Sequence, residues 1–382
     1  MVRKLLLSLW LLCFLSGCGN PRADIKRIQQ DGVEVVLNPK ALLHPVLITL
    51  TRIFSLSTGG DVLAAAGLTD FDMGFDVDSQ GFIYTGCLKS EKGPIFKFDP
   101  QGNLVHTFSH VGQGPGEIQG DATLDVSAAD EIVVTNTGSR KVLFFSGEGK
   151  LIREQKVKTD IIKAIPLPGG GFVAWSRILD AESEFLAKHP LQVTGPDLKA
   201  LQEIDRQQVP NPLKGGDFLG TFHIFSWSVS PGRIYSAFQD RGYDIWVHDF
   251  KGNLVRKIRK EFESVPVSEN FKAGYLKLFE APLFDGFRKK IHFPPSMPPL
   301  DSILSDKEGR LFVLTYELDP TSGANLFDVF DAEGSLEGRM MVKVFHDDRG
   351  CAVRARRGRL YAVAENEVGD KELVVYEMAE KI

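Results

Sequence analysis

The sequence predicts an all-β fold built from equal four-stranded units, and three observations support this prediction. Apolar and polar residues alternate in short runs along most of the chain, which is the period of β-strands. Short turns rich in glycine separate these runs. Two kinds of hairpin also follow one another along the chain, so the 382 residues can form one repeated body instead of several domains.

The first kind of hairpin occurs six times. Its copies lie at residues 75–86, 124–136, 165–176, 227–238, 303–315 and 353–365. The second kind follows the first and contains a glycine turn, because a tight hairpin needs a residue that adopts a positive φ. Its copies lie at residues 96–105, 142–152, 245–255 and 327–337, with a weaker copy at 191–201.

Each pair of hairpins makes one four-stranded meander. Repeats of about 40 residues with four strands each are the sequence signature of β-propeller blades. The sequence therefore predicts a six-bladed β-propeller. A β-sandwich of irregular hairpins is the alternative, but it would not explain why both hairpins recur in the same order.

The sixth unit contains only three predicted strands, the last of them at residues 371–378. An N-terminal strand would complete this unit and close the ring, which removes the open sheet edges that favour aggregation. Residues 46–54 are predicted to be that strand, and residues 33–37 are a competing donor. We expect residues 33–382 to form one propeller domain.

The N-terminus has the features of a bacterial secretion signal. Arg3 and Lys4 precede an apolar run at residues 5–15 that is too short to span a bilayer permanently. The run ends in Leu-Ser-Gly-Cys18, which resembles the lipobox of bacterial lipoproteins. An ordinary signal peptide with a chance cysteine is the alternative.

On the lipoprotein interpretation, residues 1–17 are the signal peptide, Cys18 is the lipidated first mature residue, and residues 18–32 include a tether. Two or three acyl chains anchor a protein stably without a spanning helix. We therefore expect a location in the bacterial cell envelope, on the outer membrane and facing the periplasm or the cell surface.

The net charge bears on the class of partner, and the cysteine content bears on what stabilises the fold. The formal charge is −5, and it becomes more negative when the signal peptide leaves, which disfavours nucleic acid as a partner. Cys87 and Cys351 remain after processing. Two cysteines cannot replace a packed core, so we expect packing to stabilise the fold, and whether the two form a disulfide stays open.

The glycine-rich stretch VGQGPGE at residues 111–117 resembles a phosphate-binding loop in composition only. Such a loop needs a following helix whose N-terminus binds the anion, but alternating strand patterns follow this one. The stretch is predicted to connect the outer strand at 104–109 with the inner strand at 123–127.

The connections differ in length between the two predicted faces of the ring. The hairpin turns are short, whereas the other face contains longer connections at 88–94, 177–189, 316–325 and, between the fourth and fifth units, 262–298. Long loops on a rigid scaffold usually carry function, so we expect the working face on this long-loop side.

Several side chains on the long-loop face have the chemistry of binding anchors. In the insertion at 262–298, Tyr275, Arg288 and His292 are candidates for contact with a ligand, and the alternative is a cap that only packs on the ring. The neighbouring middle loops add five further candidates: Arg140, Trp175, Arg177, Arg241 and Tyr243. The expected ligand is an envelope protein, a small molecule or a glycan.

A metal-dependent hydrolase or lyase, similar to lactonases, is the alternative function. The sequence contains none of the local motifs of serine hydrolases or zinc peptidases, and no cofactor is evident. A divalent metal in a central channel would be bound by residues far apart in sequence. Asp76, Asp125 and Asp306 lie on inner hairpins where they would face such a channel, although each also suits a turn.

Four stretches resemble those of a known family. VDSQGFIY, FKFDPQGNLVHTF and GQGPGE follow one another, and the proline-rich stretch FPPSMPPLDSILSDKEGRLFVL lies at 293–314. Together they are similar to bacterial six-bladed β-propeller lipoproteins related to NHL-repeat and TolB-like propellers, over residues 70–378. The resemblance implies the fold and not an activity, because propellers serve as enzymes, binding modules and scaffolds.

Overall fold

The computed structural model describes residues 25–381 with some internal gaps. The gaps are residues 44, 91–92, 181, 212–213, 215–217, 221–224, 282–283, 345, 348–349 and 352. The expected signal peptide and Cys18 lie outside the described residues. Within the described part of the chain, no helix has both the length and the apolarity needed to cross a membrane.

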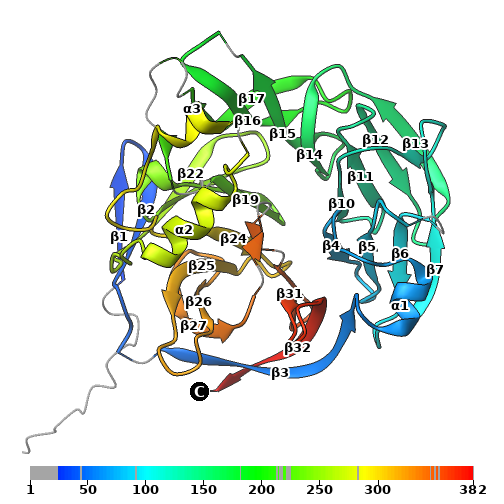
Figure 1. The fold of residues 1–382 in the computed structure, drawn as a ribbon. Coiled ribbons are helices and arrows are strands. Elements are labelled where there is room, and N and C mark those ends of the chain that lie inside the picture. The colour runs from blue at the N-terminus through cyan, green and yellow to red at the C-terminus, as the bar shows by residue number, and fades with distance from the viewer. Residues whose placement is uncertain are drawn as a thin grey trace, which may run out of the picture.

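Most strands belong to antiparallel meanders arranged around one axis, so the fold is propeller-like, as predicted (Figure 1). Three meanders are separate four-stranded sheets. The first contains β4 (Phe75–Val77), β5 (Ile83–Gly86), β6 (Ile95–Phe98) and β7 (Leu104–Phe108). The second contains β10 (Ala122–Val126), β11 (Ile132–Asn136), β12 (Lys141–Phe145) and β13 (Leu151–Lys156). The third contains β14 (Asp160–Pro166), β15 (Phe172–Leu179), β16 (Phe185–Thr194) and β17 (Ala200–Pro210).

The fourth meander is extended by two N-terminal strands. It contains β19 (Phe225–Ser230), β20 (Arg233–Phe238), β21 (Asp244–His248) and β22 (Leu254–Lys260). Strand β2 (Val33–Asn38) pairs in parallel with β22, and β1 (Lys26–Gln30) pairs with β2. Residues 33–37 therefore do not close the ring, and β1 lies within the segment that was expected to be part of a tether.

The last two meanders share one eight-stranded sheet, so the structure does not contain six separate blades. The fifth meander contains β24 (Ser302–Ser305), β25 (Leu311–Leu318), β26 (Asn325–Phe330) and β27 (Leu336–Val342). The sixth contains β30 (Val353–Arg356), β31 (Arg359–Glu365) and β32 (Lys371–Lys381), together with β3 (Val46–Ser57).

Strand β3 joins these two meanders. It pairs antiparallel with β32, as predicted for residues 46–54, and its first residues also pair in parallel with β27. A strand of 12 residues is long enough to reach both neighbours. At the other end of the sheet, Arg356 of β30 donates a hydrogen bond to the carbonyl of Ser305 in β24, so the sheet curls into an almost closed barrel.

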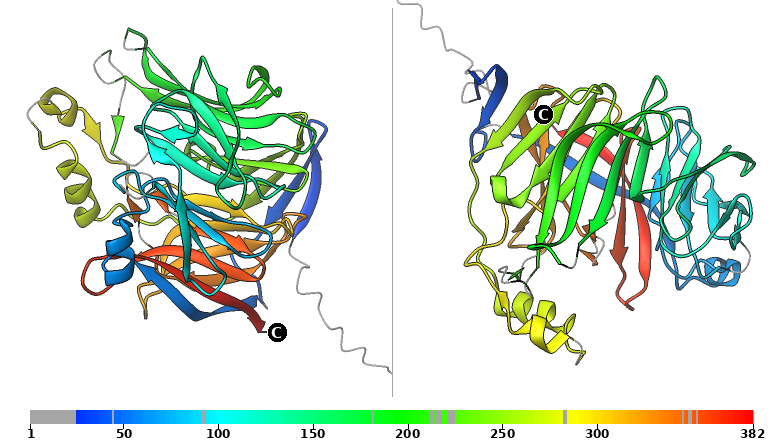
Figure 2. Two further views of the ribbon diagram at one scale, coloured as in Figure 1. Left: turned by 90° about the vertical axis from the view of Figure 1, so that its right-hand side faces the viewer. Right: turned by 90° about the horizontal axis from the view of Figure 1, so that it is seen from above.

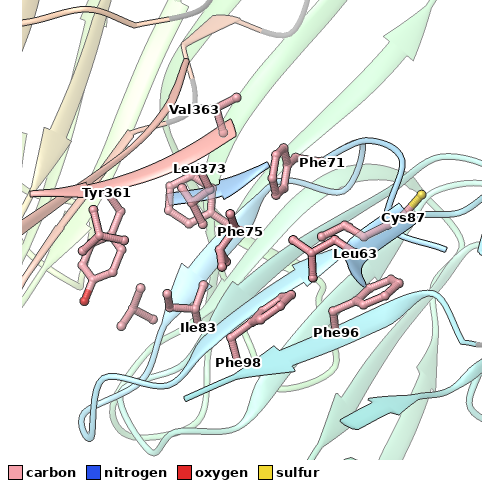
Figure 3. Packing of buried hydrophobic residues seen from close by; sticks show 14 residues of the cluster. Leu63, Phe71, Phe75, Ile83, Cys87, Phe96, Phe98, Tyr361, Val363 and Leu373 are labelled. Carbon is pink, nitrogen blue, oxygen red and sulfur yellow. The ribbon is translucent and has the colours of Figure 1, made fainter. Parts of the chain in front are cut away.

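The first and sixth meanders pack against each other around a shared apolar core (Figure 3). Phe75, Ile83 and Phe98 of the first meander meet Val363 and Leu373 of the sixth. All five side chains are buried. The helix α1 (Asp61–Ala66), which follows β3, adds Leu63 to this cluster. Burial of apolar side chains from both ends of the chain thus stabilises the closed ring.

The glycine-rich stretch at 111–117 is a connector between the first and second meanders, as predicted. It links β8 (His110–Val111) with β9 (Glu117–Ile118), which pair in parallel. Buried Lys141 donates to the carbonyl of Gly114 at 2.8 Å, and the side chain of Glu154 accepts from the amide of Gly116 at 3.0 Å. Two strands of the second meander therefore hold the connector in place.

The remaining elements lie in the connections. The insertion between the fourth and fifth meanders contains α2 (Glu269–Lys277), α3 (Asp285–Arg288) and β23 (Ile291–His292), and β23 pairs with β18 (Phe218–Leu219). A 3-10 turn (Gln239–Arg241) follows β20, and β28 (His346–Asp347) pairs with β29 (Gly350–Cys351). Cys87 is buried and free, and the side chain of Cys351 lies outside the described residues.

Gly338 provides a test of the junction between β3 and β27. A Cβ atom at this position would overlap the carbonyl oxygen of Val46, its partner in β3. We expect Gly338→Ala to lower the free energy of unfolding by about 1–3 kcal/mol, since backbone must move to make room. The measurement is chemical or thermal denaturation.

The matched control is Gly274→Ala in α2, where an added Cβ atom meets nothing within 4 Å. Alanine favours helix by up to about 1 kcal/mol over glycine, so this variant should be as stable as the wild type or slightly more stable. Equal stability of the two variants would show that the contact between β3 and β27 contributes nothing to the fold.

Candidate functional site

The insertion leaves the ring and returns at nearly the same place. Pro266 and Ser296 form an isolated bridge, and the amide of Met297 donates to the carbonyl of Val265 at 2.7 Å. These contacts close the base of residues 268–294, which we call the cap. Figure 2 shows the cap helices standing off one face of the ring, whereas β1 lies at the opposite face.

Aromatic side chains form the interior of the cap. Tyr275 is 6% exposed, and its ring centroid lies 6.1, 5.6 and 5.8 Å from those of Phe271, Phe279 and Phe293. Burial raises the pKa of Tyr275 to about 12. Tyr275 thus packs inside the cap and stabilises it. Of the two alternatives from the sequence, ligand contact or packing, its position fits packing.

The cap has a small excess of basic residues. Its sequence contains five Lys or Arg residues and three Asp or Glu residues, although the whole chain has a formal charge of −5, and Lys272 pairs with Glu269. Arg288 and His292, both candidates from the sequence, are exposed. The backbone of His292 accepts from the amide of Gly220, which ties the cap to the connection between the third and fourth meanders.

Tyr243 is a buried structural residue and not part of the long-loop surface. Its hydroxyl donates to Asp328 at 2.8 Å, across the boundary between the fourth and fifth meanders. Lys260 lies 3.2 Å from the same carboxylate, and both side chains of this ion pair are fully buried. Arg339 donates to Asp328 at 2.7 Å. A buried carboxylate needs such partners, so these contacts hold two meanders together.

Three further candidates also make their contacts within the ring. Arg241 pairs with Asp205 at 2.7 Å, and Arg177 pairs with Asp160 at 2.8 Å. Trp175 is half-buried and packs against neighbouring aromatic rings. The loop expected at 177–189 is also shorter than predicted, because β15 and β16 extend to within a few residues of each other.

Arg140 is exposed and occupies the left-handed region, with φ of 52°. No described hydrogen bond or ion pair joins it, or any of the four other ring candidates, to Arg288 or His292. The structure therefore separates the predicted site into two exposed residues on the cap, one exposed residue on the ring, and a set of residues that pack or pair within the ring.

Five charged side chains gather where the innermost strands approach the axis, and we call them the axial charge cluster. Asp76 comes from β4, Asp125 from β10, Lys163 from β14, and Arg354 and Arg356 from β30. Lys163 pairs with Asp125 at 2.7 Å, and Arg356 lies 3.6 Å from Asp76. Arg354 lies 3.9 Å from Asp76 and 3.8 Å from Asp125.

The sequence indicated the two aspartates of this cluster and missed its three cations. Arg354 and Arg356 lie in a predicted hairpin and Lys163 lies two residues before another, and a basic residue in an inner strand gives no sign that it approaches an aspartate from a distant unit. Asp306, the third aspartate expected at the channel, accepts from Arg310 of its own hairpin at 2.7 Å and is a turn residue.

The pKa values of the two axial aspartates are shifted in opposite directions. Burial alone would raise the pKa of Asp76, but Arg356, Arg354 and the amides of Val77 and Val126 outweigh burial and hold the pKa below its ordinary value. At Asp125, burial outweighs Lys163 and Arg354 and raises the pKa. One oxygen of Asp125 is buried without a hydrogen-bond partner.

The axial charge cluster does not fit a divalent metal. A Ca²⁺ or Mg²⁺ site surrounds the ion with oxygen ligands, whereas arginine and lysine side chains occupy the space beside both aspartates. Within the described ranges, no three His, Cys, Asp or Glu side chains are placed to hold a metal ion. We therefore derive no catalytic step through a metal here.

Two grooves lie among the short turns, on the face opposite the cap. One, of about 560 Å³, lies between the second and third meanders and is lined by the turns that follow β10 and β14. The other, of about 380 Å³, lies between the sixth and first meanders. Neither groove could be predicted from the sequence, because each forms only where two folded meanders meet.

Comparison with known proteins supports the fold. No family model matches the chain, and no curated protein matches its sequence. An exported protein from Bacteroides fragilis is 11% identical, covers 90% of this chain and 99% of its own, and gives a TM-score of 0.50. A DUF4221 family member from Bacteroides vulgatus is 15% identical, covers 87% and 98%, and gives 0.51.

A gluconolactonase from Xanthomonas campestris is also similar, with 14% identity over 93% of this chain and 100% of its own. Its TM-score of 0.45 is too low to support an argument about activity. The comparisons therefore show a propeller-like fold and leave the function to be argued from this chain's own residues.

The axial aspartates give a testable contrast. Asp76→Asn should lower the free energy of unfolding at neutral pH by about 2–4 kcal/mol, because a carboxylate that accepts two amide hydrogen bonds and faces two arginines is lost. Asp125→Asn should cost less, since its raised pKa shows that the charged form is already disfavoured.

The pH dependence follows from the same shifts. The stabilisation from Asp76 is present above its ordinary pKa of 3.8 and is lost as pH falls through the lower folded value, so Asp76→Asn should weaken the acid sensitivity of the fold. Equal losses for both variants across the pH range would contradict this assignment. The measurement is thermal unfolding at several pH values.

Proposed function

We propose that this protein is a lipid-anchored β-propeller of the bacterial cell envelope that binds a partner through its cap. The observation that carries the proposal is the cap itself, which stands off the ring and presents exposed Arg288 and His292 over an aromatic interior. Arginine on a rigid apolar support is a common binding anchor. The partner is an acidic envelope protein, or a small-molecule or glycan ligand.

The ring is the rigid scaffold for this cap. In this proposal the propeller has six blades, and the eight-stranded sheet supplies the fifth and the sixth, with β3 as the outer strand of the sixth. Both connections that meet at β18 and β23 leave the outer strand of one blade and enter the next. A site on such connections is held in place by the scaffold and free to vary in sequence.

Binding is favoured over catalysis because, among the described residues, the two axial aspartates face arginine and lysine side chains, which leave no room for a lactonase-like metal centre beside them. The cap, in contrast, presents Arg288 and His292 to solvent. A small excess of basic residues on an otherwise acidic protein indicates an acidic partner surface, because charge complementarity steers association and selects partners.

The test is a pull-down from solubilised envelope with the wild-type protein and with the double variant Arg288→Ala, His292→Ala. Each substitution should weaken binding by up to about 2 kcal/mol if the residue is an anchor, and binding should fall as salt concentration rises. The thermal midpoint should stay unchanged because both side chains are exposed.

Lys251 and Lys307 provide the matched control. Both are exposed basic residues in short turns on the other face, and their replacement by alanine should leave binding intact. If substitutions on the two faces weaken binding equally, or if the cap variant loses binding because it unfolds, the cap has only a structural role.

The lipid anchor has its own test. Cys18→Ser should remove acylation, so the protein should leave the membrane fraction and incorporate no labelled fatty acid, because serine cannot form the thioether to the diacylglyceryl group. The motivation is the Leu-Ser-Gly-Cys18 sequence after the apolar run. Unchanged membrane fractionation with unchanged labelling would contradict the lipoprotein assignment.

A further inference from the structure

Three meanders place a tyrosine near the start of their second strand. Tyr84 lies one residue, and Tyr235 and Tyr361 lie two residues, after the first paired residue of the strand. They are opposite Asp76, Ser228 and Arg354 respectively. Each ring is buried between its own meander and the next one around the axis. The equivalent positions allow the three hydroxyl groups to be compared directly.

Two of the three hydroxyl groups have hydrogen-bond acceptors. The hydroxyl of Tyr84 donates to Asp78 at 3.1 Å and lies 3.4 Å from the carbonyl of Gly147 in the second meander. That of Tyr235 lies 3.4 Å from the carbonyl of Gly309 in the fifth meander. In both cases a backbone carbonyl of the neighbouring meander lies within hydrogen-bonding distance of the hydroxyl group.

The hydroxyl of Tyr361 has no acceptor for its proton among the described residues, although the residue is 1% exposed, and the side chain of Arg359 approaches its oxygen as a donor. The ring of Tyr361 belongs to the apolar cluster between the sixth and first meanders, and its oxygen points away from the other labelled side chains (Figure 3). A buried hydroxyl without an acceptor is costly, so it indicates a missing acceptor at this position.

The missing acceptor would lie in the groove of about 380 Å³, which we call the seam pocket. Gln80 and Pro100 line it from the first meander, and Arg357, Arg359, Tyr361 and Glu377 line it from the sixth. Its volume is within the range of small-molecule sites.

Two arginines give the seam pocket a positive character. Arg359 donates from one nitrogen to the carbonyl of Pro100 at 3.1 Å, and Arg357 donates to the carbonyl of Ser79. A guanidinium group has five N–H donors, so each arginine keeps others for a ligand. Arg357 adopts φ of 56°, a conformation that costs a residue other than glycine about 1 kcal/mol or more.

The remaining groups fit the same type of ligand. Burial raises the pKa of Tyr361, partly opposed by Arg359 and Arg357, so the hydroxyl stays protonated and can donate. Exposed Glu377 at the rim can accept a hydrogen bond from a hydroxyl group of the ligand. Carboxylates and phosphates are the groups that arginine binds with paired N–H donors.

We propose that the seam pocket binds a small hydroxylated anion, whose carboxylate or phosphoryl oxygens are held by Arg357, Arg359 and the hydroxyl of Tyr361. This site is on the face opposite the cap and does not depend on the function of the cap. The ligand joins the two meanders that meet where the ring closes, so binding stabilises the folded protein.

The test is isothermal titration calorimetry on the full-length protein in detergent with glucuronate, inorganic phosphate and neutral glucose. We expect saturable binding of at least one anion and none of glucose. Glucuronate binding alone identifies a carboxylate ligand, and phosphate binding alone identifies a phosphoryl ligand. Failure of both anions to bind at millimolar concentrations overturns the proposal.

Tyr361→Phe should weaken the binding of the anion about tenfold, since a hydrogen bond to a charged group is lost. Tyr84→Phe is the matched control, because that hydroxyl already donates to Asp78, and it should leave the affinity unchanged. Equal anion affinity for wild type and Tyr361→Phe would overturn the role of this hydroxyl and, with it, the proposed site.

The thermal midpoint measured without ligand distinguishes a Tyr361 hydroxyl that is available to a ligand from one that only stabilises the fold. Tyr361→Phe should lower the thermal midpoint less than Tyr84→Phe does, because the hydroxyl of Tyr361 has no described acceptor to lose, whereas that of Tyr84 donates to Asp78. An equal fall for both variants would show that Tyr361 has an internal partner, which also overturns the proposal.

Discussion

The pairing of β3 with β32 is the constraint on which the rest of the structure depends. It joins a strand near the N-terminus to the last strand of the chain through a ladder from Leu47 to Ser57. Without β3 the sixth meander would have three strands and an open outer edge, and the first and sixth meanders would lose the covalent link that holds their shared core together. The additional pairing with β27 fixes where β3 begins, and Gly338 is the residue that lets the two backbones approach. The seam pocket exists only because this closure brings Tyr361 beside the turns of the first meander.

The inner strands have a second requirement, because the backbone amides on their inward edges have no neighbouring strand to pair with. Polar side chains from the preceding meander accept hydrogen bonds from these amides. Asp76 accepts from the amide of Val126, Thr135 from that of Ala164, and Ser228 from that of Ser305. Asp76 and Thr135 are buried and Ser228 is half-buried, and all three are used by the backbone of the next meander, since unpaired backbone amides in a buried edge are costly. This explains why the polar side chains of the inner strands, including the axial charge cluster, hold the ring together.

The sequence predicted the features that depend on local chemistry. Hairpin turns, the connector at 111–117, the helical first half of the insertion and the closing strand follow from turn residues and from the spacing of apolar residues. Contacts between distant units could not be read in this way. Residues 33–38 have a strand pattern, but nothing in it indicates pairing with β22. Tyr275 has the same composition and spacing whether it faces a ligand or Phe279. Arg354 and Arg356 look like the flank of a basic turn until the ring places them beside Asp76.

The two proposed sites lie on opposite faces of the ring, and the topology explains how they differ. Connections between meanders can lengthen without disturbing strand register, so one face could acquire a cap large enough for a macromolecular surface. Hairpin turns on the other face are fixed by the register of their strands, and a site there must form in the gap between neighbouring turns, which fits a small anion. Because β1 lies on the side opposite the cap, a lipid on Cys18 would be attached only a few residues from that side. The anchor would then hold the cap away from the membrane surface, where a protein partner can reach it.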